Sequence, residues 1–536
     1  MANKNTISPI ARELSEVFRA QRGVESIRAT VDEPKLKVDE TVGKVAYVYE
    51  KVRVAIDYQE EHLIRKNAIA RMLKRRITMR ERGRNIAAPL LRELIRAGYL
   101  KNNYFPESRI PDIERMVAKY VRLIDIAASR NPNLKERNRT IKWITQVASA
   151  EIEAYLSPTI KDDALVEAMY KTIRSQIDLT EQMRAVEDQD IQVYIAIHRA
   201  LVKSDHAILR YHLTYYYAPW WRYATDEEIE AFAVQLPRLM RKIELQISNK
   251  LSDRLFRYAK KFAPLFLIFK DILNERAADY EALLADPNQL ESAIRKTCDK
   301  RYTESSTKLS RGVFRSIIYI FFTKTIMAFA LELPYEAIFL SQIKLLPLAI
   351  NVVFHPFLMF IIATSIRVPA EENTRKIFQG ISEIVYDPDE KVLLKQRERT
   401  FRTSRALNAV FSLLYAAAFI ITFGGIIWLL RVLDFSSVSS FLFVFFLSVI
   451  SFFALHLRNN AKELVMVSKR DSALMAVIDF FALPVLRAGR WISSKTSKVN
   501  IFMFIMDFVI EAPFKVLIET VEDWLAFQRQ KKEEIM

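Results

Sequence analysis

The chain has 536 residues, 51% of them hydrophobic, and its 80 Lys and Arg against 63 Asp and Glu give a net charge of +17. Its one cysteine, Cys298, excludes a disulfide framework and a multi-cysteine metal site. Nine glycines are few beside an average usage of about 7%, and glycine serves tight turns, so the composition predicts an all-α chain of long helices.

Residues 1–40 are polar and irregular, which predicts a mobile N-terminal arm with one short helix over 9–20. The first residues contain no apolar stretch typical of a secretory signal, so we expect the later spans to direct membrane insertion. Between residues 41 and 224, apolar positions recur every three or four residues. This pattern predicts a large cytoplasmic bundle of amphipathic helices.

The first helix of this bundle, expected from residue 45 onward, ends in a dense run of basic side chains. Such a run is typical of a solvated helix end, and it also suits a patch that binds acidic lipid or RNA. Because the loops beside the apolar runs are basic too, we favour anionic lipid at the cytoplasmic face over nucleic acid. The candidates for this basic patch are Arg71, Lys74, Arg75, Arg76, Arg80, Arg82 and Arg84.

Three of the six histidines, His198, His206 and His212, precede the aromatic stretch 215–223. Spacings of eight and six residues do not place them three or four apart on one helix face, where helical metal ligands usually lie. We therefore predict buried, hydrogen-bonded imidazoles, with no metal and no cofactor. The aromatic stretch is expected to pack between helices or to lie at a membrane interface.

Residues 225–312 open with a capping box at Thr225, which predicts the start of a helix. The apolar stripe that follows predicts one long amphipathic helix over 225–262, which Pro264 ends or kinks, and then a polar connector. A helix of this length suits self-association with a second copy or contact with a protein partner.

Residues 313–458 contain four apolar runs, each close to the roughly 20 residues that a helix needs to cross a hydrocarbon core about 30 Å thick. Lys and Arg gather before the first run, in the loop 367–406 and after the last run. Since basic residues near spans stay inside, this pattern predicts a multi-pass protein of the cell membrane with both termini cytoplasmic. The runs are 314–333, 337–366, 407–430 and 441–457, with the first connection at 334–336.

The C-terminal part, 459–536, is basic and then amphipathic, which predicts helices at the membrane interface. For the apolar segment over 500–520, a fifth span is the alternative. In the loop 367–406, Asp387-Pro-Asp389 has the spacing of a metal-bridging pair, but it equally suits a helix N-cap. The pair Gly424-Gly425 in the third run is interpreted as allowing close helix packing.

Three basic side chains within the apolar runs form the candidate site: Lys324, Lys344 and His355. Charge inside a bilayer is costly and usually faces the interior of a helix bundle. Lys344 and His355 are eleven residues apart, close to three turns, so we expect them to share a helix face beside Pro347 and Pro356. The alternative is that Lys344 snorkels to the surface and His355 bonds a neighbouring helix.

Phosphate-binding glycine loops, zinc spacings and catalytic motifs are missing from the sequence, so we predict no enzyme. The long helical region ahead of the spans favours a membrane-anchored structural or interaction scaffold. The intramembrane residues favour a second hypothesis, a channel or transporter component.

Overall fold

The computed structural model is helical almost throughout, which confirms the all-α fold class. Among the residues that it describes there is no strand, and one isolated bridge joins Lys35 to Pro106. These described residues are 7–30, 33–38, 60–78, 85–177, 186–249, 251–364, 371–386, 405–461, 465–466 and 473–496.

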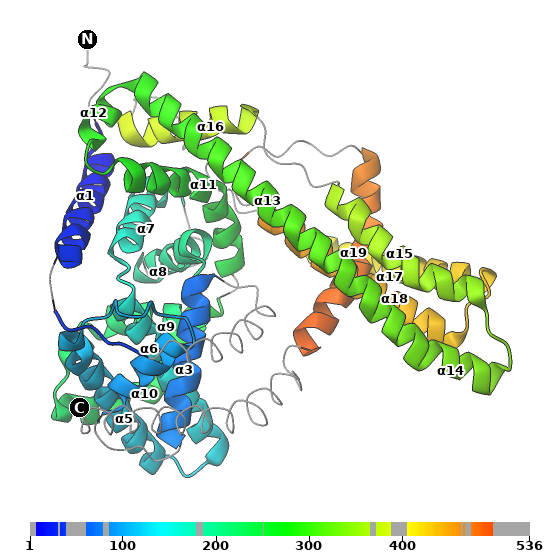
Figure 1. Cartoon of the computed structure of the whole chain (residues 1–536), viewed down its shortest axis with the longest axis horizontal. Helices are drawn as coiled ribbons and strands as arrows, with labels where there is room; N and C mark the ends of the chain where they lie inside the picture. Colours follow the sequence, from blue (N-terminus) through cyan, green and yellow to red (C-terminus); the bar gives the residue numbers. More distant parts are fainter. Residues whose placement is uncertain are drawn as a thin grey trace, which may run out of the picture. The chain divides into compact units, whose positions relative to one another are not determined.

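The chain divides into two compact units, and each contains buried apolar clusters of its own (Figure 1). Unit 1 comprises 1–286, 382–398 and 512–536, and unit 2 comprises 287–381 and 399–511.

Unit 1 is a bundle of short helices around a large hydrophobic cluster that includes Trp221 and Phe232. In this bundle α3 and α5 both pack on α6, and α8 packs on α11. The helices are α1 Pro9–Thr30, α3 Glu61–Thr78, α4 Ala87–Arg96, α5 Ile110–Arg130, α6 Leu134–Leu156, α7 Ile160–Ile173, α8 Val186–Ile197, α9 His206–Tyr217, α10 Asp226–Ile247, α11 Ser252–Arg276 and α12 Tyr280–Ala285.

Side-chain caps explain where several of these helices begin. The Asn133 side chain accepts hydrogen bonds from the first backbone amides of α6, and Asp205 does the same for α9. At α10 the Thr225 side chain and Glu228 complete the capping box that the sequence predicts. Each cap satisfies amides that the helix itself leaves without partners.

The single helix expected over 225–262 is wrong, because α10 ends at Ile247 and a separate helix, α11, begins at Ser252. The Ser248 hydroxyl donates back to the Glu244 carbonyl, and the Asn249 side chain accepts from the Leu251 amide, so both polar side chains compete with helical bonds. Pro264 then lies inside α11 and does not end it.

Within the predicted N-terminal arm, α1 is longer than the expected helix over 9–20. It buries Ala11, Leu14 and Phe18 against unit 1, and the Ser8 hydroxyl donates to the Ile384 carbonyl at 2.6 Å. Residues 45–59, where we expect the first bundle helix to start, lie outside the described residues.

Unit 2 contains the apolar helices. Four helices of the described residues are long and apolar enough to cross a membrane, within Pro287–Leu340, Leu345–Thr364, Ala409–Val432 and Ser437–Leu455. The full elements are α13 Pro287–Met327, a π-helical turn Ala328–Glu332, α14 Leu333–Tyr335, a second π-helical turn Glu336–Leu340, α15 Leu345–Thr364, α16 Glu371–Tyr386, α17 Arg405–Val432, α18 Ser437–Ala461 and α19 Ala473–Thr496.

The first apolar run does not end at 334–336 as expected. The helical path continues through Pro334 to Leu340 and turns at Ser341, whose φ is 51°. Proline lacks the amide that would bond the carbonyl four residues earlier, and the backbone here widens into π-helical turns on either side of it. Lys344 therefore precedes α15 and lies in the connection between the first two candidate spans.

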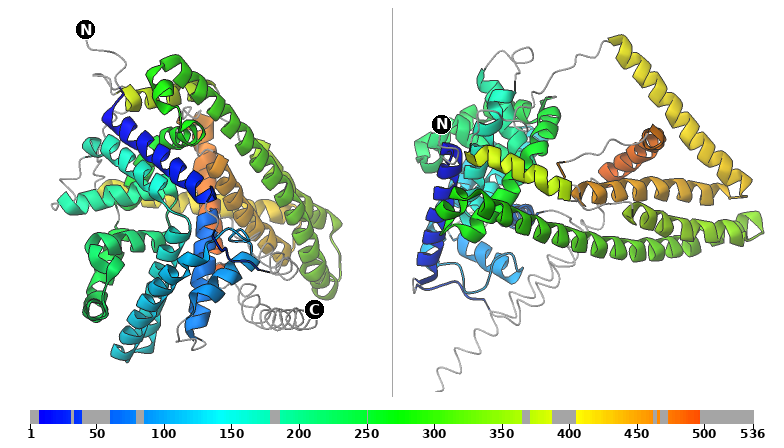
Figure 2. Two further views of the ribbon diagram at one scale, coloured as in Figure 1. Left: turned by 60° about the vertical axis from the view of Figure 1, so that its left-hand side comes forward. Right: turned by 90° about the horizontal axis from the view of Figure 1, so that it is seen from above.

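Close packing occurs at Gly489, where α19 crosses α18. A Cβ at Gly489 would lie 2.0 Å from the Ser448 carbonyl oxygen. Gly424 and Gly425 have nothing within 4 Å of an added Cβ, so their expected packing role is wrong. Figure 2 shows α17 approaching α18 at the end where the two helices connect.

The predicted helix over 500–527 lies outside the described residues.

Candidate functional site

Five polar side chains are buried among the candidate spans of unit 2. Lys324 lies on α13, Glu332 on the first π-helical turn, Asn351 and His355 on α15, and Ser439 on α18, each at most 1% exposed. Large apolar side chains on the same helices are exposed instead, as expected for surfaces in contact with lipid.

Four of these side chains, those of Lys324, Glu332, Asn351 and Ser439, form a continuous hydrogen-bonded network. The Lys324 ammonium donates to Asn351 Oδ1 at 2.5 Å, and Asn351 Nδ2 donates to Glu332 Oε1 at 2.5 Å. The Ser439 hydroxyl donates to Glu332 Oε2 at 2.7 Å. The Asn351 amide thus bridges two opposite charges, and only one orientation of the amide serves both of them.

The network satisfies buried charges that would otherwise be costly. The Lys324 ammonium also lies 4.4 Å from the ring centroid of Phe446, close enough for a cation–π contact. With one ammonium and one carboxylate the network is neutral, which suits its place inside an apolar bundle.

His355 contacts two backbone carbonyls from two helices. Its Nδ1 lies 3.0 Å from the Asn351 carbonyl oxygen, and its Nε2 lies 3.1 Å from the Phe443 carbonyl oxygen on α18. A carbonyl oxygen only accepts, so both ring nitrogens donate only when the imidazole is protonated. A neutral ring therefore satisfies only one of the two contacts. The predicted bond to a neighbouring helix matches the contact with Phe443.

Lys344 does not share a face with His355, because α15 starts one residue after it. Its ammonium donates to Asp434 Oδ1 at 2.5 Å, and its backbone amide donates to Glu336 Oε2 at 3.0 Å. The Lys344 side chain is 27% exposed. Lys344 lies in the segment just before α15, and Asp434 lies in the segment between α17 and α18. The ion pair therefore joins two interhelical segments and is separate from the buried network.

Sequence reasoning missed Glu332, Asn351 and Ser439 as members of the site. Two of them carry a signal that spacing could have revealed. Glu332 follows Lys324 by eight residues, and Asn351 precedes His355 by four, so each pair shares a helix face. Ser439 carries no such signal, since only the packing of α18 brings it to Glu332.

The predicted basic patch is only partly exposed. Arg75 and Arg76 both donate to Glu93 on α4, with shortest distances of 2.6 and 3.2 Å, and Lys74 alone of the four described candidates is exposed. Arg71 is partly buried. Arg80, Arg82 and Arg84 lie outside the described residues.

In unit 1 the aromatic stretch 215–223 packs partly between helices, as predicted. Trp221 is fully buried and donates from Nε1 to the Tyr120 hydroxyl at 3.2 Å. The Lys119 ammonium donates to Glu151 at 3.1 Å and to the Trp221 carbonyl at 3.1 Å. Burial lowers the pKa of Lys119, and the Glu151 carboxylate opposes that shift. This cluster ties α5, α6 and the aromatic stretch together.

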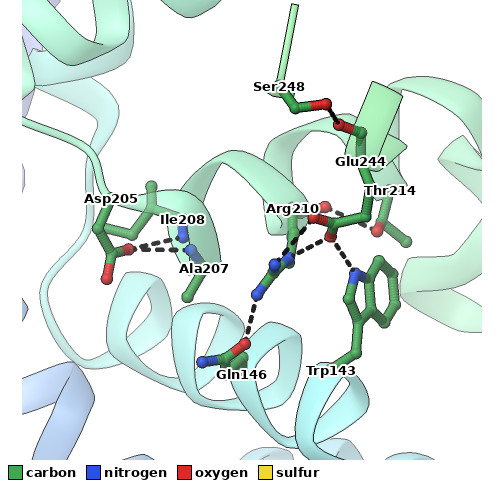
Figure 3. Close-up of polar contacts among 9 residues, drawn as sticks. All are labelled: Trp143, Gln146, Asp205, Ala207, Ile208, Arg210, Thr214, Glu244 and Ser248. Atoms are coloured by element: carbon green, nitrogen blue, oxygen red, sulfur yellow. Dashed lines mark hydrogen bonds and ion pairs between the residues drawn. The ribbon is translucent and has the colours of Figure 1, made fainter. Parts of the chain in front are cut away.

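A cavity of about 770 Å³ opens among α6, α9 and α10. Three of its lining residues bond one another, as Figure 3 shows: the Arg210 guanidinium donates to Glu244 at 2.6 and 3.0 Å, and Trp143 Nε1 donates to the same carboxylate at 2.9 Å. Burial opposes ionisation, but the bonds from Arg210 hold the pKa of Glu244 below its ordinary value. Arg139 and Lys142 add positive charge to the lining of this cavity.

The sequence matches no family model, and neither a curated protein nor a solved structure matches it.

Proposed function

We propose that this chain is a membrane protein that moves protons across a bilayer through the network of Lys324, Glu332 and Asn351 and the neighbouring His355. One observation carries the proposal: three protonatable side chains lie together among candidate spans at no more than 1% exposure. Buried ionisable groups of this kind in membrane proteins typically belong to ion pathways or proton relays. The proposal is the second of the two hypotheses from the sequence, with Lys344 removed from the pathway.

The test is proton flux by the full chain in sealed liposomes containing a pH-sensitive dye. Replacing His355 by Gln keeps a donor for one carbonyl but removes the titrating ring, so flux should fall by at least about tenfold. Lys344→Leu is the matched control, because it breaks a partly exposed ion pair outside the network. Wild-type flux from His355→Gln, or wild-type flux no greater than that of empty liposomes, would overturn the proposal.

The proposed orientation places both termini in the cytoplasm of a cell whose plasma membrane holds the protein. The positive-inside rule supports it, since basic residues flank the first and last candidate spans. The Lys344–Asp434 pair supports the even number of crossings, because it joins two connections that this topology puts on one side. A single cysteine at Ser341, in a Cys298→Ser background, should react with an impermeant maleimide in intact cells. Labelling only after permeabilisation would contradict the proposed orientation.

The scaffold hypothesis has support of its own in the exposed face of α10. Val234 and Leu245 are 62% and 66% exposed and lie eleven residues apart, on one side of the helix. We propose self-association through this face. Purified protein should have a dimeric mass that Leu245→Glu converts to a monomeric one, while a monomeric wild type at micromolar concentration would contradict it.

A further inference from the structure

Three potential metal ligands from separate helices meet inside unit 1. Asp163 lies on α7, His198 lies on the π-helical turn His198–Val202 that extends α8, and His212 lies on α9. One ligand atom from each residue lies within 4.8 Å of those from the other two. The three residues lie on three different helical elements. The spacing of histidines along one helix, which argued against a metal in the sequence, therefore does not apply to this site.

His198 supplies the second observation. Its side chain is 1% exposed, and among the described residues its Nε2 has no hydrogen-bond partner. Its Nδ1 lies 3.3 Å from the Ser204 hydroxyl, which leaves Nε2 as the atom with an unmet need. A buried polar atom without a partner costs about 1–3 kcal/mol, so such an atom indicates a missing ligand. π-helical turns also occur frequently at functional sites.

His212 also has its Nδ1 beside a hydroxyl group. Its Nδ1 lies 3.4 Å from the Tyr194 hydroxyl, and its ring centroid lies 4.4 Å from that of His198. Bonds to the outer nitrogen of a ligating imidazole orient the ring toward the metal.

Asp163 completes the set with a negative charge. The Thr159 hydroxyl donates to Asp163 Oδ2 at 2.7 Å, which orients the carboxylate and leaves its other oxygen for a metal. Asp163 is the most exposed of the three residues.

We propose that Asp163, His198 and His212 bind a divalent first-row transition metal, with water in the remaining positions. Two imidazoles and one carboxylate suit Zn²⁺ and Fe²⁺ better than Ca²⁺ or Mg²⁺, which prefer all-oxygen ligands. The site is independent of the proposed proton pathway, since all of its residues belong to unit 1.

The test uses full-length protein purified in detergent and stripped of metal with a chelator. Calorimetric titration with Zn²⁺ should show one ion bound per chain, and Co²⁺ should produce the visible absorption bands of a low-coordinate nitrogen and oxygen site. His198→Gln and His212→Gln should each weaken Zn²⁺ binding by at least about 100-fold, and Asp163→Asn by about 10–100-fold.

His206→Gln is the matched control, because His206 starts α9 but lies outside the ligand set. It should bind Zn²⁺ as the wild type does. Asp163→Asn changes an exposed side chain, so it keeps the test decisive where a buried histidine variant fails to fold. Folded wild type that binds neither Zn²⁺ nor Co²⁺, or unchanged affinity in Asp163→Asn and His212→Gln, would overturn the proposal.

Discussion

Asn351 joins the ammonium of Lys324 to the carboxylate of Glu332. Both charged groups are buried, so water does not replace the hydrogen bonds that are lost when the amide is removed. Asn351→Leu should therefore destabilise the protein by about 3–5 kcal/mol, as loss of a partner from a buried ionic network does. Thermal unfolding in detergent measures this change. Thr325→Ala is the control, because Thr325 is only partly buried and its hydroxyl donates to the Phe321 carbonyl of its own helix. Equal stability of the two variants would contradict the role assigned to Asn351.

His62 in unit 1 gives a pH dependence whose sign follows from its burial. Burial lowers the pKa of His62 below its ordinary value of 6.5, and its Nε2 has no hydrogen-bond partner among the described residues. The unfolded chain then binds more protons than the folded chain as pH falls through and below 6.5, so stability decreases on acidification. The melting temperature should fall between about pH 7 and 5 less steeply in His62→Gln than in the wild type. Parallel slopes would show that His62 contributes nothing.

At the residue level, the sequence predicted part of the candidate site. Lys324 and His355 are conspicuous because charge is rare in apolar runs; Lys324 belongs to the buried network, and His355 lies beside it, in contact with the Asn351 carbonyl. Lys344 is equally conspicuous, but its role depends on where α15 begins, and a continuous apolar run hides that boundary. Ser439 and the carbonyl of Phe443 come from packing between helices, which spacing along the chain does not contain.

Among the elements, the contact of α18 with α19 depends on a missing side chain at Gly489. Gly489→Ala should destabilise unit 2 by at least about 1–3 kcal/mol, the usual cost of overpacking, because the Ser448 backbone cannot move aside easily. Gly424→Ala has open space and removes a flexible helical residue, so it should be neutral or stabilise by up to about 0.5–1 kcal/mol. Thermal unfolding of both variants in one detergent compares them, and equal melting temperatures would contradict the close approach.

Helix starts were more predictable than helix ends. The capping box at Thr225 is a local pattern, and the structure confirms it. The break at 248–251 was not predicted, because the apolar stripe continues across it and only the hydroxyl of Ser248 and the amide of Asn249 compete with the helix. At Pro334 the error was in the other direction. The sequence predicted a connection between two spans there, but the helical path continues through this proline.

For the whole molecule, composition predicted more than any motif did. Few glycines and repeated apolar spacing predicted an all-α chain, and four long apolar runs correspond to four helices of the described residues that are able to cross a membrane. Glycine content and apolar spacing do not show which polar side chains meet inside the helix bundle. The arrangement of Glu332, Asn351 and His355 depends on how the helices pack, so the buried polar network became visible only in the structure.

The measurement that tests the proton pathway most directly is the initial rate of proton entry into liposomes that carry wild type or Glu332→Gln at equal density. The amide of Gln has the shape of the carboxylate and can still bond Asn351 and Ser439, so folding should be preserved while the titrating group is lost. We predict proton entry well above that of empty liposomes in the wild type, and a rate at least about tenfold lower in Glu332→Gln. Equal rates in the two proteins would contradict the pathway.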